Sequence, residues 1–306
     1  MRITTGMIQR NVLSNLNELS DKLARTQSRA ASGKQITRPS DDPYNAARAM
    51  GLRSALSANA SYKSNIADAQ DWQNSTESAL DSITRYVHRA NDLLVQGGTD
   101  TADQISRNAL ADEIDQIVQG VKETANSTYG DKYLFSGTAT ATPPYTQGAD
   151  DTYKGNQGGL DPATPGVLRE IGPGVTISIN SVGQEILGDG QAAGDGKLLD
   201  TLRTISTDLR AGNGAALRGT DLTKLNDNLN QVLEVRARNG ATTNRLQAAD
   251  SRLEDIASSV TRQLSDTEDA DMAQTLIDFN SQSASYQAAL RAGASIVQTS
   301  LMDFLR

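Results

Sequence analysis

The chain contains no cysteine among its 306 residues. This absence excludes disulfide bonds, thiol nucleophiles and metal sites built on thiolates. A single histidine, His88, also excludes zinc sites that need several imidazole ligands. Aromatic residues make up only 4% of the chain. Because aromatic side chains supply much of the buried area of large cores, we do not expect one large globular core.

Positive charge and long apolar runs are scarce as well. The 29 basic and 37 acidic residues give a net charge of −8, and no cluster of Lys and Arg is visible, so we expect no nucleic-acid partner. No stretch approaches the roughly 18 consecutive apolar residues of a membrane span, and the start lacks the apolar run of a cleaved signal peptide. We therefore expect no membrane insertion. We expect the chain to be either cytosolic or exported by a route that leaves no cleaved apolar leader.

Proline and glycine divide the chain. Pro39 and Pro43 stand near the start, and the other five prolines fall between Pro143 and Pro173, where glycine also concentrates. Both residues favour turns over helix interiors. This distribution predicts helical segments at both ends and a turn-rich middle with short strands.

Apolar residues recur at alternating steps of three and four in the helical segments, the pattern of helices that bury one narrow seam against a partner helix. The longest such stripe starts at Ile66 and ends at Leu94. Two further stripes lie at the chain ends. They comprise Val12, Leu16, Leu19 and Leu23 near the start, and Met272, Leu276, Phe279, Tyr286, Leu290, Val297, Leu301 and Phe304 near the end. We expect the terminal helices to pair with each other and with neighbouring copies, because a long helix with so narrow a seam is marginal alone.

The middle of the chain has a different periodicity. Residues 175–179 alternate apolar and polar side chains, which indicates a half-buried strand, and Tyr133-Leu134-Phe135 is a short apolar run closed by Ser136-Gly137. A small β-rich domain is therefore expected between helices. The predicted fold class is mainly α: a long coiled-coil-like helical rod formed by the N- and C-terminal segments, with this β-rich domain inserted in the middle.

Residues for catalysis are not found in any recognisable pattern. His88 stands beside Arg89 and off the apolar stripe, so we interpret it as a solvated helix residue. Asp41-Asp42 and the acidic run 265–271 could ligate calcium, but helix capping explains both more simply. We expect no enzyme activity, no cofactor and no metal.

Four short segments together resemble the flagellin superfamily. The first contains Ser32, Gly33, Asp41 and Asp42 in the run 32–43, and the second is Glu268-Asp269-Ala270-Asp271 before the C-terminal stripe. The third, Tyr133-Leu134-Phe135-Ser136-Gly137, and the last residues, 300–306, are similar to the hook-associated members of this family.

The resemblance implies a domain organisation. Residues 1–42 and 266–306 would be assembly helices that pair with each other. Residues 43–137 and 198–265 would form the two halves of a helical rod, and 138–197 an outer β-rich domain.

The resemblance also implies a role. The chain would be a structural subunit of the bacterial flagellum, exported by the flagellar type III apparatus without a cleaved signal. It would act outside the cell as a junction adaptor between hook and filament. Its partners would be further copies of itself in a ring, the preceding hook-associated protein, flagellin, and a cytoplasmic export chaperone at the C-terminal helix. The alternatives are the flagellin filament subunit itself and, from another class, a cytosolic coiled-coil adaptor or export chaperone.

Overall fold

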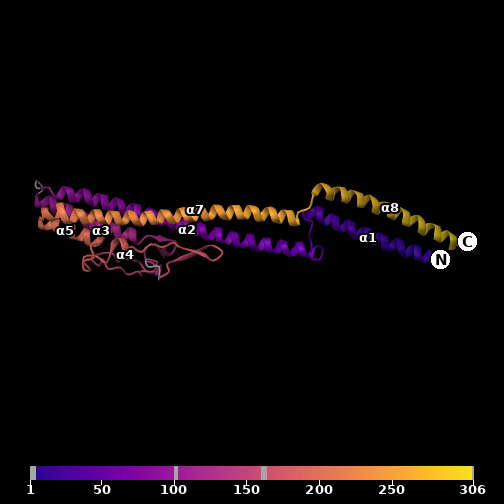
Figure 1. Ribbon diagram of the computed structural model, residues 1–306, viewed down its shortest axis with the longest axis horizontal. Helices are drawn as coiled ribbons and strands as arrows, with labels where there is room; N and C mark the ends of the chain where they lie inside the picture. The colour runs from indigo at the N-terminus through magenta and orange to yellow at the C-terminus, as the bar shows by residue number, and fades with distance from the viewer. Residues whose placement is uncertain (1–4, 100–102, 160–163, 305–306) are drawn as a thin grey trace. The chain divides into compact units, whose positions relative to one another are not determined.

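The structure, a computed structural model, describes residues 5–99, 103–159 and 164–304 (Figure 1). It is mainly helical, with long helices at both ends and short strands in the middle, which confirms the predicted fold class. In chain order the elements are α1 (Thr5–Ser32), α2 (Pro43–Gly97), α3 (Gln104–Ala125), β1 (Thr128–Tyr129), β2 (Lys132–Tyr133), β3 (Leu168–Gly172), β4 (Val175–Ser178), α4 (Gly183–Leu187), α5 (Leu198–Ala211), α6 (Gly214–Ala216), the π-helical segment η1 (Leu217–Asp221), α7 (Leu222–Glu268) and α8 (Met272–Phe304). No helix in the described ranges is both long and apolar enough to cross a membrane.

The chain divides into two compact units, and the divisions fall inside α2 and α7. Unit 1 comprises Met1–Ala58 and Asp255–Arg306, and unit 2 comprises Asn59–Glu254. Each unit is described by itself below.

Unit 2 is built on the part of α2 that carries the long apolar stripe. Stepping by three and four from Ile66 to Leu94 passes through nine residues, and every one is buried. The predicted seam is thereby confirmed. Trp72 lies beside it and is also buried, and its ring forms a T-shaped pair with that of Tyr129.

The partner seam on α7 mixes apolar and polar residues. Leu225, Val232 and Leu246 are buried, and so are Asn228 and Asn239. Both amides have partners, because Asn228 donates to the Thr201 hydroxyl at 2.9 Å and Asn239 to the Gln73 carbonyl at 3.2 Å. Buried polar groups need such bonds to offset the loss of water.

Helices α3 and α5 pack together and complete the helical part of unit 2. Ile114 and Ile117 of α3 are buried, whereas Ile105 is 80% exposed. Ile105 lies in the first turn of α3, where the cap formed by Asp103 sets the start of the helix.

The middle domain contains two separate two-stranded antiparallel sheets, β1–β2 and β3–β4. The strand expected in 175–179 is present as β4, with Ile177 buried. The expected first strand is shorter than its apolar run, since β2 ends at Tyr133. Leu134 and Phe135 leave the ladder but remain buried, and the Phe135 carbonyl accepts the Gly183 N–H at 2.8 Å.

Unit 1 contains the two terminal helices, and Figure 1 shows α1 and α8 side by side. Residues Val12 and Leu16 lie near Gly293, while Thr26 bonds to Gln282, so the two helices run antiparallel. Among the described side chains of unit 1, the only buried hydrophobic residues are Ala46 and Ala49. The described side chains of unit 1 therefore form almost no apolar core.

Candidate functional site

The connection between α1 and α2 meets the connection between α7 and α8. Lys34 and Asp269 form an isolated antiparallel bridge. Two backbone hydrogen bonds flank it, from Gln35 N–H to the Glu268 carbonyl at 2.7 Å and from Ala270 N–H to the Gly33 carbonyl at 2.9 Å. We call residues 33–35 and 268–270 the loop clip. It joins two of the segments that carry the family resemblance, although more than 230 residues separate them in sequence.

A buried carboxylate also joins the two connections of the loop clip through its side chain. Glu268 is 5% exposed. Its Oε1 lies 2.8 Å from Lys34 Nζ, and its Oε2 pairs with the Arg53 guanidinium from α2. The two cations retain about half of their exposure, with side chains 40% and 50% exposed. The two positive groups beside this carboxylate offset the cost of burying it.

Gly33 allows α1 to end where the clip begins. Its φ of 68° lies in the left-handed region, and its N–H donates to the Arg29 carbonyl at 2.9 Å. A glycine in this conformation commonly ends a helix because it lacks the Cβ that would make the turn costly. Nothing lies within 4 Å of a Cβ added there, so only the conformation selects glycine.

Asp41 and Asp42 cap the turn and helix that follow. Asp41 Oδ2 accepts the Arg38 N–H at 2.9 Å, and Asp42 Oδ1 accepts the Asn45 N–H at 3.0 Å in the first turn of α2. These backbone bonds are the main reason that the pKa of each carboxyl lies below its ordinary value. Asp271 caps α8 in the same way, through Ala273 N–H at 2.9 Å. The capping interpretation is confirmed for all three.

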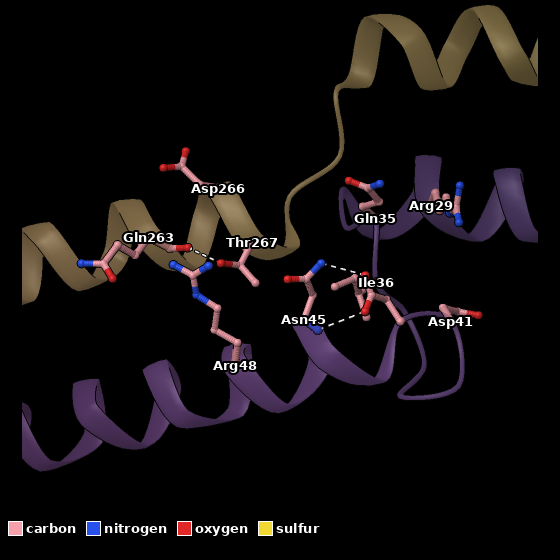
Figure 2. Close-up of a pocket in the computed structure, with 10 residues that line it drawn as sticks. Arg29, Gln35, Ile36, Asp41, Asn45, Arg48, Gln263, Asp266 and Thr267 are labelled. Atoms are coloured by element: carbon pink, nitrogen blue, oxygen red, sulfur yellow. Dashed lines mark hydrogen bonds between the residues drawn. The ribbon is translucent and has the colours of Figure 1, made fainter.

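A polar pocket of about 300 Å³ lies beside the loop clip (Figure 2). In Figure 2 the Arg48 side chain extends from α2 toward α7, near Thr267. The lining residues are Arg29, Gln35, Ile36, Asp41, Asp42, Asn45, Arg48, Gln263, Asp266 and Thr267. Within the described ranges, no group of three His, Cys, Asp or Glu residues could hold a metal ion. His88 is exposed on α2.

Helices α1 and α8 approach each other closely, but the described large apolar side chains between them are only half-buried. A Cβ added to Gly293 would come within 3.1 Å of Val12 Cγ1 and 3.8 Å of Leu16 Cδ1, so the helices approach closely at this glycine. Further along, the buried Thr26 hydroxyl donates to Gln282 Oε1 at 2.8 Å, which sets the register of the pair. Val12, Leu16, Leu19, Leu23, Phe279 and Tyr286 are half-buried in this contact region of the terminal helices.

The other residues of the C-terminal stripe lie elsewhere. Met272 is 41% exposed, Leu276 50% and Leu290 44%, and Ile277 beside them is 61% exposed. The positions turned inward include Thr275 and Gly293, which are buried, with Gln282 and Ala289 half-buried. We call Met272, Leu276, Ile277 and Leu290 the exposed α8 stripe. Val297, Leu301 and Phe304 lie beyond the described side chains.

The motif Tyr133–Gly137 belongs to unit 2 and is structural there. Leu134, Phe135 and Ser136 are each at most 1% exposed, and the Ser136 hydroxyl donates to the Thr142 carbonyl at 2.6 Å. A Cβ on Gly137 would lie 2.2 Å from the Asn156 carbonyl oxygen. Tyr133 is half-buried. Compact packing of the backbone explains why this run needs small residues after its apolar ones.

Several residues that position the site were not found from the sequence. Arg53 and Lys34 form the cationic partners of Glu268, and Thr26 and Gln282 pair across the terminal helices. The signal available for Glu268 was weak: it is an acid at the end of a long helix, where the helix dipole disfavours negative charge. An acid in that place suggests a specific cationic partner.

Comparison with known proteins gives this arrangement a family context. The family model described as "Bacterial flagellin N-terminal helical region" matches residues 3–140, and "Bacterial flagellin C-terminal helical region" matches 222–305. Flagellar hook-associated protein 3 of Escherichia coli (strain K12) is 28% identical over 320 residues, covering 99% of each chain. Flagellin of Bacillus subtilis (strain 168) is 26% identical over 323 residues, covering 100% of each. The crystal structure of Bacillus cereus FlgL has a TM-score of 0.58 and 22% identity, covering 70% of this chain and 99% of that one.

Proposed function

Because this chain belongs to the bacterial flagellin family, whose two models together match more than two thirds of it, we propose that it joins the hook to the flagellin filament. It is a structural subunit of the flagellum, and the family is not one of enzymes. In this role one end would bind another hook-associated protein and the other the first flagellins. The full-length similarity to hook-associated protein 3 supports the junction role.

The observation that supports an assembly role is the composition of unit 1. Its described side chains include almost no buried hydrophobic residue, whereas the exposed α8 stripe presents four large apolar side chains that are 41–61% exposed. Complete burial of such a side chain contributes about 1.5–3 kcal/mol. Covering what is still exposed would therefore add several kcal/mol per copy, enough to order a marginal helix pair. We infer that further copies of this chain cover the stripe in a ring.

The route outside the cell follows from the same role. We propose that the chain is exported through the flagellar type III apparatus without a cleaved leader and acts extracellularly. Before export, a cytoplasmic chaperone would cover the exposed α8 stripe. Residues 1–42 and 266–306 would be the assembly segments, 43–137 and 198–265 the rod, and 138–197 the outer domain.

The experiment that tests the stripe uses complementation of a deletion strain. Leu276→Glu combined with Leu290→Glu should give non-motile cells with hooks but no filaments, because charge cannot be buried against a neighbour. The matched control is Asn280→Glu with Gln287→Glu, which adds the same charge at other exposed positions of α8. Normal swimming with the stripe variant, at equal amounts of exported protein, would refute the assembly role of the stripe.

A second candidate function is the filament subunit, which the full-length match to Bacillus subtilis flagellin favours. The two differ in abundance and position. Antibody labelling along the whole filament would support the filament subunit, and labelling at its base alone would support the junction adaptor.

A further inference from the structure

In unit 2, an ionisable residue occupies a buried seam position directly before the start of α7. Stepping back along α7 by three and four from Val232 through Asn228 and Leu225 leads to Asp221. All four are buried, and Asp221 is only 2% exposed. Asn228 has hydrogen-bond partners, but no hydrogen-bond donor among the described residues reaches Asp221 Oδ2. A buried carboxylate in this state is costly, so the group requires an explanation.

The backbone around Asp221 is irregular in the same place. Asp221 ends the π-helical segment Leu217–Asp221, which interrupts the helical run between α6 and α7. Such segments contain an extra residue, and they occur frequently at functional sites. Helix α5 ends just before this segment, at the left-handed Gly212. Asp221 thus lies where α5 turns back into α7.

A second carboxyl faces Asp221 from α5. Asp208 lies within side-chain hydrogen-bond reach of Asp221, and its Oδ1 accepts Asn213 Nδ2 at 3.2 Å. Two adjacent carboxylates in a buried place repel each other, so one of them holds a proton more tightly. Burial first, and then Asp208, raise the pKa of Asp221 to about 6.

Among the described residues, the groups that lower the pKa of Asp221 do not cancel the rise. Lys224 on α7 attracts the Asp221 carboxylate, and the Thr220 hydroxyl reaches its Oδ1 only at 3.5 Å; both lower the pKa without cancelling the rise. From α3, the Arg107 guanidinium donates to the carbonyls of Gly97 and Gly212. Arg218 donates to the Gly98 carbonyl at 2.7 Å, at the end of α2.

We propose that Asp208 and Asp221 form a proton-sharing latch: one shared proton ties α5 to the π-helical segment in mild acid, and its loss to water at neutral pH loosens the turn between them. The segment that loosens is 209–224. The latch lies wholly within unit 2, so it does not depend on the junction role.

The direction of the pH effect follows from the raised pKa. The ordinary value for this carboxyl is 3.8, so between about pH 4 and 6 the folded chain holds a proton that the unfolded chain has released. The latch therefore stabilises the turn fully below pH 4, and this contribution is lost as pH rises through 6. A difference of about two pKa units corresponds to at most a hundredfold change in the opening equilibrium.

Hydrogen exchange on the full chain tests the proposal. After correction for intrinsic rates, amides in 209–224 should open roughly tenfold more at pH 7.5 than at pH 5, because part of the contribution is already lost between about pH 4 and pH 5. Asp221→Asn should remove this pH dependence, because its amide cannot ionise. The matched control Asp227→Asn, an exposed acid on α7, should retain it. Equal pH dependence in wild type and Asp221→Asn would overturn the latch.

A titration of the unmodified side chain keeps the test independent of the variant's folding. Carbon-13 NMR of the aspartate carboxyls in the full-length wild type should show one group titrating near pH 6, strongly perturbed by Asp208→Asn. If every aspartate titrates below pH 4.5, the shared proton does not exist and the proposal fails.

Discussion

Glu268→Gln is the most informative perturbation of the loop clip, because it keeps the shape of the side chain and removes its charge. The buried carboxylate of Glu268 meets Lys34 Nζ at 2.8 Å and the Arg53 guanidinium at its other oxygen. Removing it leaves two cations that are 40% and 50% exposed and can return to water. The free energy that keeps the loop clip closed should therefore fall by about 1–2 kcal/mol. This is less than the roughly 3–5 kcal/mol lost when one partner of a fully buried ion pair is removed.

Glu268→Gln should open the loop clip locally, and this opening can be measured at the clip's own backbone amides. Hydrogen exchange at the amides of Gln35 and Ala270, whose N–H groups make the two flanking bonds, reports its opening. A loss of 1–2 kcal/mol predicts exchange about five- to thirtyfold faster at both amides. The control Glu254→Gln, an exposed acid on α7, should leave both rates unchanged.

The opposite truncation separates charge pairing from simple packing. Lys34→Met combined with Arg53→Met strands the buried carboxylate, which costs more than stranding exposed cations. This double variant should therefore open the clip more than Glu268→Gln does. If Glu268→Gln leaves exchange at Gln35 and Ala270 unaltered, or the double variant is the milder one, the account of the clip is refuted.

Three further outcomes are expected. Gly293→Leu should separate α1 from α8, because even a Cβ there comes within 3.1 Å of Val12; exchange in α1 should rise, and Ala288→Leu on the exposed face should leave it unchanged. Proteases should trim the free chain at both ends before they cut 44–264, since so few of the described apolar side chains of unit 1 are buried. Uniform resistance along the chain would contradict this. Asp42→Ala should speed hydrogen exchange at the Asn45 amide at neutral pH, because it removes the carboxylate that accepts this N–H. In the wild type the pKa of Asp42 is lowered, so the bond contributes stability above pH 3.8 and should be lost only as the pH falls below that value. Identical exchange in variant and wild type would count against the cap.

Periodicity predicted the fold well where one face alone is buried. The stripe from Ile66 to Leu94 is mostly apolar because it lies in the core of unit 2, so hydrophobicity reports burial directly. Periodicity does not report burial everywhere, since an apolar residue in the first turn of a helix, such as Ile105, can be exposed when the cap decides where the helix starts.

The terminal helices were predicted less fully for a physical reason. Phe279 and Tyr286 lie in the contact region with α1, but the intervening inward positions are held by small or polar residues such as Thr275 and Gln282. Leu276 and Leu290, the more apolar neighbours, stay exposed. A hydrophobic pattern cannot distinguish a face that binds its own chain from one that awaits another. Assignment of the stripe to assembly stays a prediction.

Specific pairings were beyond sequence reasoning altogether. The contact of Glu268 with Lys34 and Arg53 depends on two connections that are remote in sequence and meet only in the folded chain. The cap of α2, in contrast, depends on a neighbour three residues away in the sequence. Asp42 could be identified as this cap because Pro43, which directly follows it, favours the first position of a helix.

The most direct test of the junction role is electron microscopy of cells that lack this gene, with flagellin assayed in the medium. The proposed role predicts hooks without filaments and flagellin released into the medium, because the adaptor that retains the first flagellins is missing. Filaments of normal length on these cells would contradict it.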